Sequence, residues 1–151
     1  MTVIPAVVTD NGRAKFPQML GGIVAFSIAS YFKVGVGGWI DPGGGPEPRT
    51  PDATLSDLDI IENPGNYPSV PAIPTFQKSF TSGDLTFISP STLQCSCLLD
   101  FAEYNSDGSG NPEIWELGIF DAAGTMIAYG TFPMQTKDVS KQIQNIVQIT
   151  F

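Results

Sequence analysis

The chain has 151 residues, which is enough for one domain but too few for two of full size. Charged residues make up only 15%, and 16 glycines and 13 prolines interrupt the sequence so often that a helical bundle is not expected. The net charge of −8 disfavours nucleic acid and anionic membranes as partners, and the absence of histidine excludes Ser-His-Asp or Cys-His catalysis and histidine-based zinc sites.

The first 40 residues are mostly apolar and contain many glycines. Thr9 and Asp10 can cap a short helix, which Pro17 should limit. We expect no secretory signal, because no early Lys or Arg precedes an apolar run, and no membrane span, because Pro, Gly and Ser interrupt the uncharged stretch before Lys33. The following alternation predicts a strand with one large apolar face, made by Val24, Phe26, Ile28, Phe32, Val34 and Val36.

Residues 41–74 differ sharply in composition from the rest of the chain. They hold 8 of the 13 prolines and six acidic residues against one arginine. This spacing of prolines permits no regular sheet or long helix, although residues 55–61 could make one or two helical turns. We therefore predict an extended acidic Pro/Gly-rich loop or arm, which becomes ordered mainly through contacts outside its own domain.

From residue 75 onward the sequence alternates in the way that an antiparallel sheet does. A strand begins at Phe76 and is expected to continue, after the turn at 82–84, through residues 85–89. Residues 113–121 and 125–132 predict a hairpin, which a polar loop follows. The expected inward faces are Leu93, Cys95, Cys97, Leu99 and Phe101 in one strand, Trp115, Leu117 and Ile119 in the next, and Ile143, Val147, Ile149 and Phe151 in the last.

Cys95 and Cys97 are the only cysteines, and one residue separates them. In a strand they share one face at a distance of about 7 Å, which is too long for a disulfide. We expect two buried, reduced thiols and synthesis in a reducing cytoplasm. A lone C-x-C pair is not a metal site.

Acidic residues on both sides of the predicted hairpin invite comparison with the carboxylate pair of a glycosidase. They are Asp100, Glu103, Glu113 and Glu116. Solvated carboxylates on a polar face are the simpler interpretation, because the sequence contains no nucleophile with an activating base and no phosphate-binding glycine loop. No catalytic residue and no cofactor are therefore assigned.

Residues 105–116 also have the ligand spacing of an EF-hand loop. The positions are Asn105, Asp107, Ser109, Gly110, Asn111, Glu113 and Glu116. The first position lacks an acidic residue, Pro112 replaces an aliphatic residue, and strands rather than helices flank the loop. A hairpin turn needs the same Asn, Asp, Ser and Gly residues, so we expect a turn and no metal site.

Trp39 and Trp115, with neighbouring Phe and Tyr residues, could form a surface on which sugars stack. Aromatic residues at alternate strand positions more often belong to a core. The low surface charge and the proline-rich segment instead indicate a subunit that is buried in a larger assembly.

The segment WELGIFDAAGTMIAYGTFP, residues 115–133, resembles the hallmark of tail-fibre N-terminal and tail-collar (baseplate-attachment) domains of tailed bacteriophages. In that family an E-[LI]-G-[LI]-[FY]-D strand leads through a turn into a strand similar to L-I-A-x-G-x-x-P. The matching residues are Glu116, Leu117, Gly118, Ile119, Phe120, Asp121, Gly124, Ile127, Ala128, Gly130 and Pro133. VTDNGRAK, FKVGVGG and NIVQITF resemble other parts of the family pattern, whereas the middle segment matches none.

The resemblance implies a non-enzymatic virion protein, assembled in the host cytoplasm, that joins tail fibres to the baseplate as a homo-oligomer, with a trimer favoured. No fibre shaft follows Phe151, which favours a baseplate or connector subunit, or an excised anchoring domain. The alternatives are a carbohydrate-binding module at a fibre tip and, third, a small glycosidase. We expect one mainly β domain over residues 1–151, an antiparallel sheet or sandwich with one or two short helices and a long arm.

Overall fold

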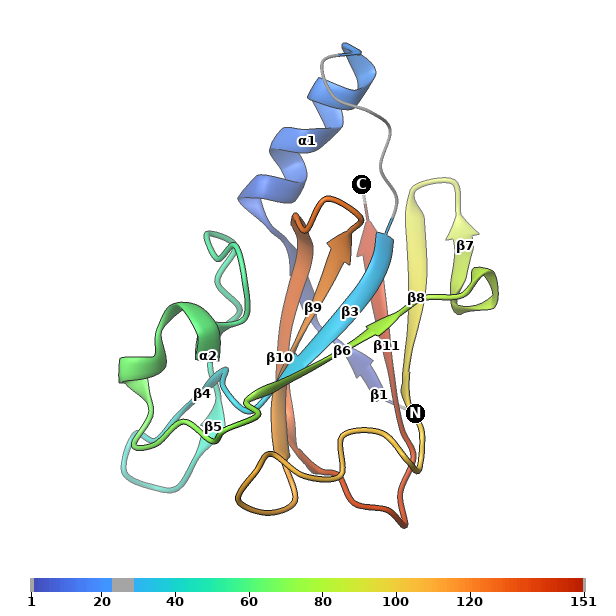
Figure 1. The fold of residues 1–151 in the computed structure, drawn as a ribbon. Coiled ribbons are helices and arrows are strands. Elements are labelled where there is room, and N and C mark those ends of the chain that lie inside the picture. Colours follow the sequence, from blue (N-terminus) through green and yellow to red (C-terminus); the bar gives the residue numbers. More distant parts are fainter. Residues whose placement is uncertain (1, 23–28, 151) are drawn as a thin grey trace.

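Two β-sheets packed face to face form the body of the computed structural model, which describes residues 2–22 and 29–150 (Figure 1). The five-stranded sheet has the order β2 (Ala6–Val8), β10 (Met126–Thr136), β9 (Glu113–Asp121), β3 (Ala29–Gly35) and β6 (Thr75–Ser79). The four-stranded sheet has the order β1 (Thr2–Ile4), β11 (Ile143–Thr150), β8 (Thr92–Leu99) and β7 (Leu85–Ser89). Neighbouring strands are antiparallel except β1 and β11, which confirms the predicted mainly β, antiparallel fold.

The main core lies between these sheets, because each contributes one apolar face. The predicted alternations in β8, β11 and the described part of β3 are confirmed there: the core includes Phe32, Val34, Cys95, Cys97, Leu99, Val147 and Ile149. Val36, just after β3, does not share this face as expected and packs against a separate cluster that contains Leu58. Both cysteines are reduced and buried, as expected. Polar side chains also link the sheets, since Gln135 of β10 and Asn145 of β11 exchange two amide hydrogen bonds of 2.9 Å.

In β9 the predicted face is only partly correct. Leu117 and Ile119 face the main core, but Ile114 joins them there in place of Trp115. The reason is a shift in the pairing of β9 with β10 between Thr131 and Gln135. Trp115 packs instead beside Trp39, with 6.1 Å between the ring centroids.

Chain segments cross from one sheet to the other on both sides of the sandwich. Pro5 separates β1 from β2 on one side, and the 3-10 turn η2 (Ser82–Asp84) separates β6 from β7 on the other. The expectation that 85–89 continues the strand begun at Phe76 is therefore wrong. Asp84 accepts hydrogen bonds from the backbone N–H and the hydroxyl of Thr81, and this capping box turns the chain between sheets.

The predicted strand from Leu93 also ends earlier than expected. β8 stops at Leu99, and Phe101 lies in a turn with half of its surface exposed. The Glu103 carboxylate accepts the backbone N–H of Asp100 at 2.8 Å and closes this turn, which removes Phe101 from the ladder. The residues Val24, Phe26, Ile28 and Phe151, which were assigned to strand faces, lie outside the described residues.

The helix α1 (Asp10–Leu20) stands at one end of the sandwich and projects beyond it (Figure 1). Thr9 caps it as predicted, because its hydroxyl accepts the N–H of Gly12 at 3.0 Å and also donates to the carbonyl of Met126. Pro17 does not end the helix, which continues for another turn with Gly21 donating to the Pro17 carbonyl. None of the described helices is long and apolar enough to cross a membrane.

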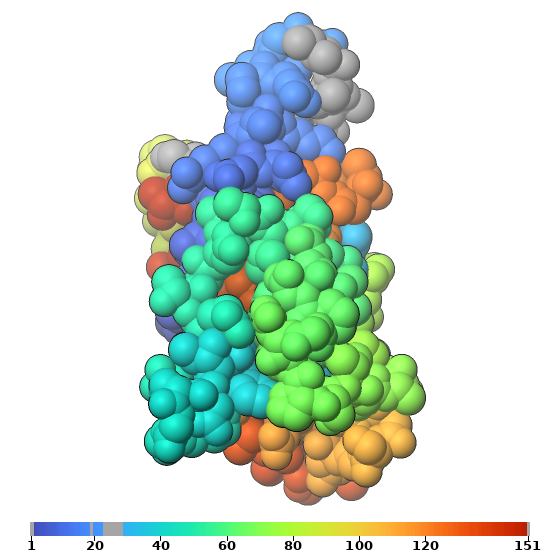
Figure 2. All heavy atoms as spheres, turned by 90° about the vertical axis from the view of Figure 1, so that its left-hand side faces the viewer, coloured from blue at the N-terminus to red at the C-terminus, as the bar shows by residue number. Residues whose placement is uncertain are grey.

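Residues 41–74 cover the outer face of the five-stranded sheet, and we call them the covering segment (Figure 2). The prolines leave only short elements within the covering segment, β5 (Glu47–Pro48), α2 (Asp59–Glu62) and the turn η1 (Pro64–Asn66); β5 pairs with the preceding β4 (Trp39–Ile40). Four of its apolar residues are buried in a second core with Phe120, Met126 and Tyr129 of the sheet, namely Leu55, Leu58, Ile60 and Tyr67. The sequence predicts that this segment becomes ordered mainly through contacts outside its own domain; in the structure, these four residues contact its own sheet.

Candidate functional site

Glu116, the first residue of the family-like motif, is fully buried where β9 meets the covering segment. Its Oε2 accepts the backbone N–H of Asp59 and the hydroxyl of Tyr129, both at 2.8 Å, and its Oε1 accepts the N–H of Ile60 at 3.2 Å. The carboxylate thus binds the N–H groups that begin α2, which have no partner inside that short helix. Glu116 therefore fixes the covering segment to the sheet.

The glycines of the FKVGVGG stretch surround this carboxylate. A Cβ atom at Gly35 or Gly37 would lie 2.7 Å from Glu116 Oε1, and one at Gly38 would lie 2.8 Å from Glu116 Cβ. Gly38 also has a φ of +79°, which disfavours any other residue. The two stretches that resemble the family pattern are therefore in direct contact, because only glycine leaves room for the Glu116 side chain.

A second carboxylate, Asp59, extends this polar cluster toward the surface. It accepts hydrogen bonds from the Tyr67 hydroxyl and from Asn63 Nδ2, and Arg49 Nε lies 3.5 Å from its Oδ2. Gly38 N–H donates to the Tyr67 oxygen at 2.6 Å. Burial and the nearby Asp59 carboxylate raise the pKa of Tyr67, so its hydroxyl keeps its proton and remains a donor.

The turn between β9 and β10 is organised by Asp121. Its Oδ1 accepts the N–H groups of Ala123 and Thr125 at 2.9 Å, and Gly124 adopts a φ of +85°. Lys15 of α1 lies 2.5 Å from the other carboxylate oxygen. Asp121 therefore shapes the turn and also holds the helix against it.

Most of the remaining motif residues make packing contacts. Leu117, Ile119 and Ala128 belong to the main core, and Phe120 stacks on Tyr31 beneath the ammonium of Lys33. Gly118 and Gly130 lie where a side chain would collide, at 2.8 Å from Met126 Sδ and 2.6 Å from Ile4 Cγ2 respectively. Ile127 is half-buried against the main core, and Pro133 is exposed beside the shift in pairing.

The four acidic residues near the hairpin do not converge on one site. Glu116 is buried in the second core, Glu103 pairs with Lys78 at 2.7 Å, and Asp100 accepts a hydrogen bond from Gln142. Glu113 is exposed at the start of β9. Asp100 and Glu103 lie in the same turn after β8, so these four residues occupy three separate places.

The residues with the EF-hand-like spacing do not lie together around one point either. Oδ1 of Asp107 accepts bonds from Ser109 and from the N–H of Gly110 within a tight turn, whereas Glu116 points away into the second core. Asn105 Oδ1 instead accepts a hydrogen bond of 2.6 Å from the ammonium of Lys137. Among the described residues no group of three or more Cys, Asp or Glu side chains could hold a metal ion.

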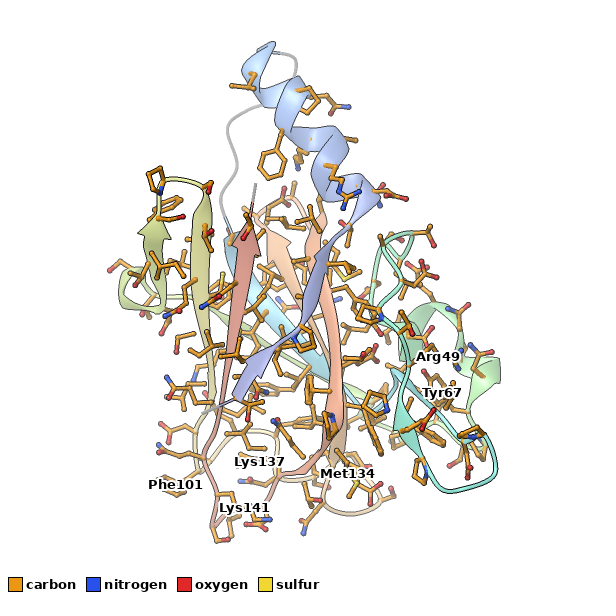
Figure 3. All side chains as sticks on the ribbon, turned by 180° about the vertical axis from the view of Figure 1, so that it is seen from behind. Arg49, Tyr67, Phe101, Met134, Lys137 and Lys141 are labelled. Atoms are coloured by element: carbon orange, nitrogen blue, oxygen red, sulfur yellow. The ribbon has the colours of Figure 1, made fainter. Side chains whose placement is uncertain are left out.

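Lys137 is a buried residue that the sequence did not single out. It lies at the end of the sandwich, near the loop of Phe101 (Figure 3). Its ammonium donates to Asn105 Oδ1, to the carbonyl of Asp138 at 2.9 Å and to that of Phe101 at 3.4 Å. Burial lowers its pKa, yet these oxygens satisfy its donors, so Lys137 links the loop before β9 to the loop after β10.

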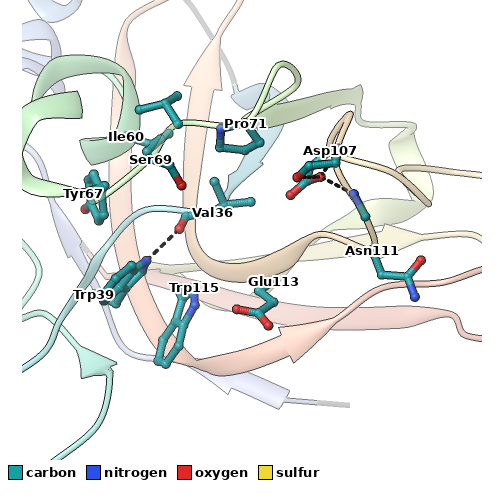
Figure 4. Close-up of a pocket in the computed structure, with 13 residues that line it drawn as sticks. Val36, Trp39, Ile60, Tyr67, Ser69, Pro71, Asp107, Asn111, Glu113 and Trp115 are labelled. Carbon is teal, nitrogen blue, oxygen red and sulfur yellow. Dashed lines mark hydrogen bonds between the residues drawn. The ribbon is translucent and has the colours of Figure 1, made fainter.

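An aromatic pocket of about 450 Å³ opens between the covering segment and the loop before β9 (Figure 4). Its apolar side holds Trp39, Trp115 and Tyr67, together with Val36 and Ile60. The lining also includes polar and acidic residues, namely Ser69, Asp107, Ser109, Asn111 and Glu113. The two tryptophans that could form a sugar-stacking surface are therefore brought together, and this pocket is the candidate binding site.

Neither family models nor curated protein sequences nor solved structures match this chain. We therefore infer the function from the motif and from the geometry of these sites.

Sequence reasoning missed the central role of Glu116. The available signal was a glutamate between two apolar residues, Trp115 and Leu117, in the strand that begins the family-like motif. Its partners Asp59 and Ile60 are more than fifty residues away in the chain, so no local pattern could identify them.

Proposed function

We propose that this chain is a non-enzymatic structural protein of a bacteriophage tail, which connects tail fibre and baseplate by protein contacts. The observation that supports this function is the family-like segment 115–133 together with its place in the fold. Its residues bind the covering segment through Glu116, shape the hairpin turn through Asp121, and supply the centre of both cores.

Such a function requires a rigid body with apolar contact area for neighbours. Exposed large apolar residues lie on the edge strand β7, at Phe87 and Ile88, and at one end of the sandwich, at Met134 near the end of β10 and in the loops at Phe101 and Val139. Figure 3 shows Phe101 and Met134 at that end, on either side of Lys137. Exposed apolar residues on an edge strand and in loops offer surface for contacts with a neighbouring subunit.

The test is to locate the chain in the particle. Mass spectrometry of purified virions from the source of the sequence should detect it among the tail proteins, and electron microscopy should place it at the junction of fibre and baseplate. Virions that lack the chain entirely would contradict the proposal.

The alternative, a carbohydrate-binding module at a fibre tip, is favoured by one observation. Trp39 and Trp115 share a pocket with Asp107, Asn111 and Glu113, residue types that often bind sugars. A glycan screen separates the two candidates, because a connector should bind protein partners and no glycan.

The proposal also excludes hydrolysis of glycans. Turnover of a glycan that disappears in a Glu113→Gln or Glu116→Gln variant would show that the chain is a small glycosidase. Glu116→Gln must be checked for folding first, because Glu116 anchors α2.

A further inference from the structure

We propose that the aromatic pocket receives a cationic side chain, the guanidinium of an arginine presented by a protein partner. That the partner is a tail protein rests on the proposed function, whereas the preference for a cation rests on the pocket alone.

The charges in the pocket are all of one sign. Asp107 and Glu113 line it, and none of its described lining residues is Lys or Arg. Nearby cations are engaged elsewhere, since Lys33 pairs with Asp57 at 2.9 Å and Arg49 lies beside Asp59. A chain with a net charge of −8 therefore presents two carboxylates without a cationic partner inside this pocket.

The rings form a concave wall rather than a flat platform. Trp39 lies between Tyr67, at 5.5 Å with the ring planes inclined by 60°, and Trp115, at 6.1 Å with an inclination of 35°. Trp115 and Tyr67 are buried and Trp39 is half-buried, so Trp39 supplies most of the accessible ring face. Tilted rings around a small space suit a cation, which is attracted to the negative faces of aromatic rings.

The polar groups of these rings are already used. The indole N–H of Trp39 donates to the carbonyl of Val36 at 2.9 Å (Figure 4), and the hydroxyl of Tyr67 donates to Asp59. The carboxylates of Asp107 and Glu113 can only accept hydrogen bonds, which suits a guanidinium, whose N–H groups all donate. The turn hydrogen bonds to Asp107 Oδ1 hold that carboxylate in place as an acceptor.

The test is a titration of the intact chain followed by NMR of its two indole N–H groups. The probes are Nα-acetyl-arginine methylamide, the matched citrulline compound, which is nearly isosteric but uncharged, and glucose. We expect saturable shifts of both indole signals with the arginine probe and none with the other two. Equal responses to arginine and citrulline, no saturable response to arginine, or binding of glucose alone would each overturn the proposal.

Variants sharpen the test. Glu113→Gln should weaken binding of the arginine probe about fivefold, because it removes one partly solvated carboxylate. Glu47→Gln makes the same change of charge at an exposed position outside the pocket and should leave binding unchanged. Equal weakening by both would show that only the net charge matters and would contradict the site.

The two proposals fail separately. If the chain is absent from virions but binds the arginine probe, the tail function is contradicted and the cation pocket is supported. If the chain is found in virions but does not bind the probe, the tail function is supported and the cation pocket is contradicted.

Discussion

Glu116 carries an ionisable group inside the protein, and opposing forces set its pKa. Burial favours the neutral acid and raises the pKa of Glu116 to about 7, although the bonds from Tyr129, Asp59 and Ile60 favour the carboxylate. A pKa in the folded chain above the usual value of 4.5 means that folding favours the protonated form. This contribution to stability is fully present below about pH 4.5 and is lost as the pH rises through 7.

Glu116→Gln should remove that pH dependence. The wild type should lose about 3 kcal/mol of unfolding free energy between pH 4.5 and 8 on account of this group, whereas the variant should show a flatter profile. Denaturant unfolding at several pH values measures both profiles. Glu113→Gln, an exposed carboxylate in the same strand, is the control and should follow the wild type. Parallel profiles for all three proteins would contradict the prediction.

Alanine variants of Gly38 and Gly43 distinguish the energetic cost of backbone strain from the cost of a steric clash. Both have a positive φ, of +79° and +110°, but a Cβ at Gly38 would meet Glu116 whereas nothing lies within 4 Å of one at Gly43. Alanine at either position should cost about 1–3 kcal/mol of unfolding free energy for the backbone. Gly38→Ala should cost at least about 1 kcal/mol more, because it also displaces Glu116. Equal costs in denaturant unfolding would show that Glu116 can move aside freely.

At the scale of single elements, local alternation predicted strands well where one face is buried. Residues 93–99 became β8 because its two faces differ in polarity, and 143–150 became β11 for the same reason. The continuation from β6 into β7 was wrong because a short turn can move the chain between sheets without changing the apolar pattern. The contact between Gln135 and Asn145 was not predicted either, since each residue alone resembles an exposed polar residue of a strand.

The covering segment shows a different limit. Its prolines correctly indicated that it forms no long hydrogen-bonded strands. They carry no information about which surface of the protein the segment covers. Leu58 and Ile60 became buried because β9 and β10 are apolar on both faces, so the outer face of the sheet needs a cover. The candidate pocket was only partly foreseen, as Trp39 and Trp115, because its acidic side comes from a distant loop.

Proteolysis tests whether the covering segment belongs to its own domain. In the isolated protein, trypsin should cut at Lys141, in the exposed loop after β10, before it cuts at Arg49. The backbone of Arg49 is held on both sides, by its N–H to Gly38 and by its carbonyl from Thr131. Digestion times followed by mass spectrometry give the order of cleavage.

A variant makes this test specific. Leu58→Ala should cost about 2–5 kcal/mol in the second core and should expose Arg49 to trypsin, while the sandwich keeps its own core. Early cleavage at Arg49 in the wild type would show that the segment depends on a partner after all.

For the whole molecule, the proposed connector function predicts assembly. The chain should form a homo-oligomer, with a trimer favoured, or a complex with another tail protein, through exposed apolar residues such as Phe87 and Phe101. Sedimentation velocity over a range of concentrations measures the mass. Phe87→Ser should weaken self-association if β7 lies in the contact, and the equally exposed Val139→Ser tests the end of the sandwich. A monomer at every concentration, also in the presence of tail proteins, would contradict this prediction.

The parallel pairing of β1 with β11 has a mechanical consequence. Thr2 lies opposite Asn145 and Ile4 opposite Val147, so β1 starts beside the early part of β11 and both strands run toward Thr150. Tension that pulls Thr2 and Thr150 apart along the strands would load the backbone bonds between β1 and β11 in shear, together rather than one after another. Resistance to such force depends on the rate of unfolding and not on its equilibrium, so a small domain of modest stability can still transmit a brief, strong pull along its length.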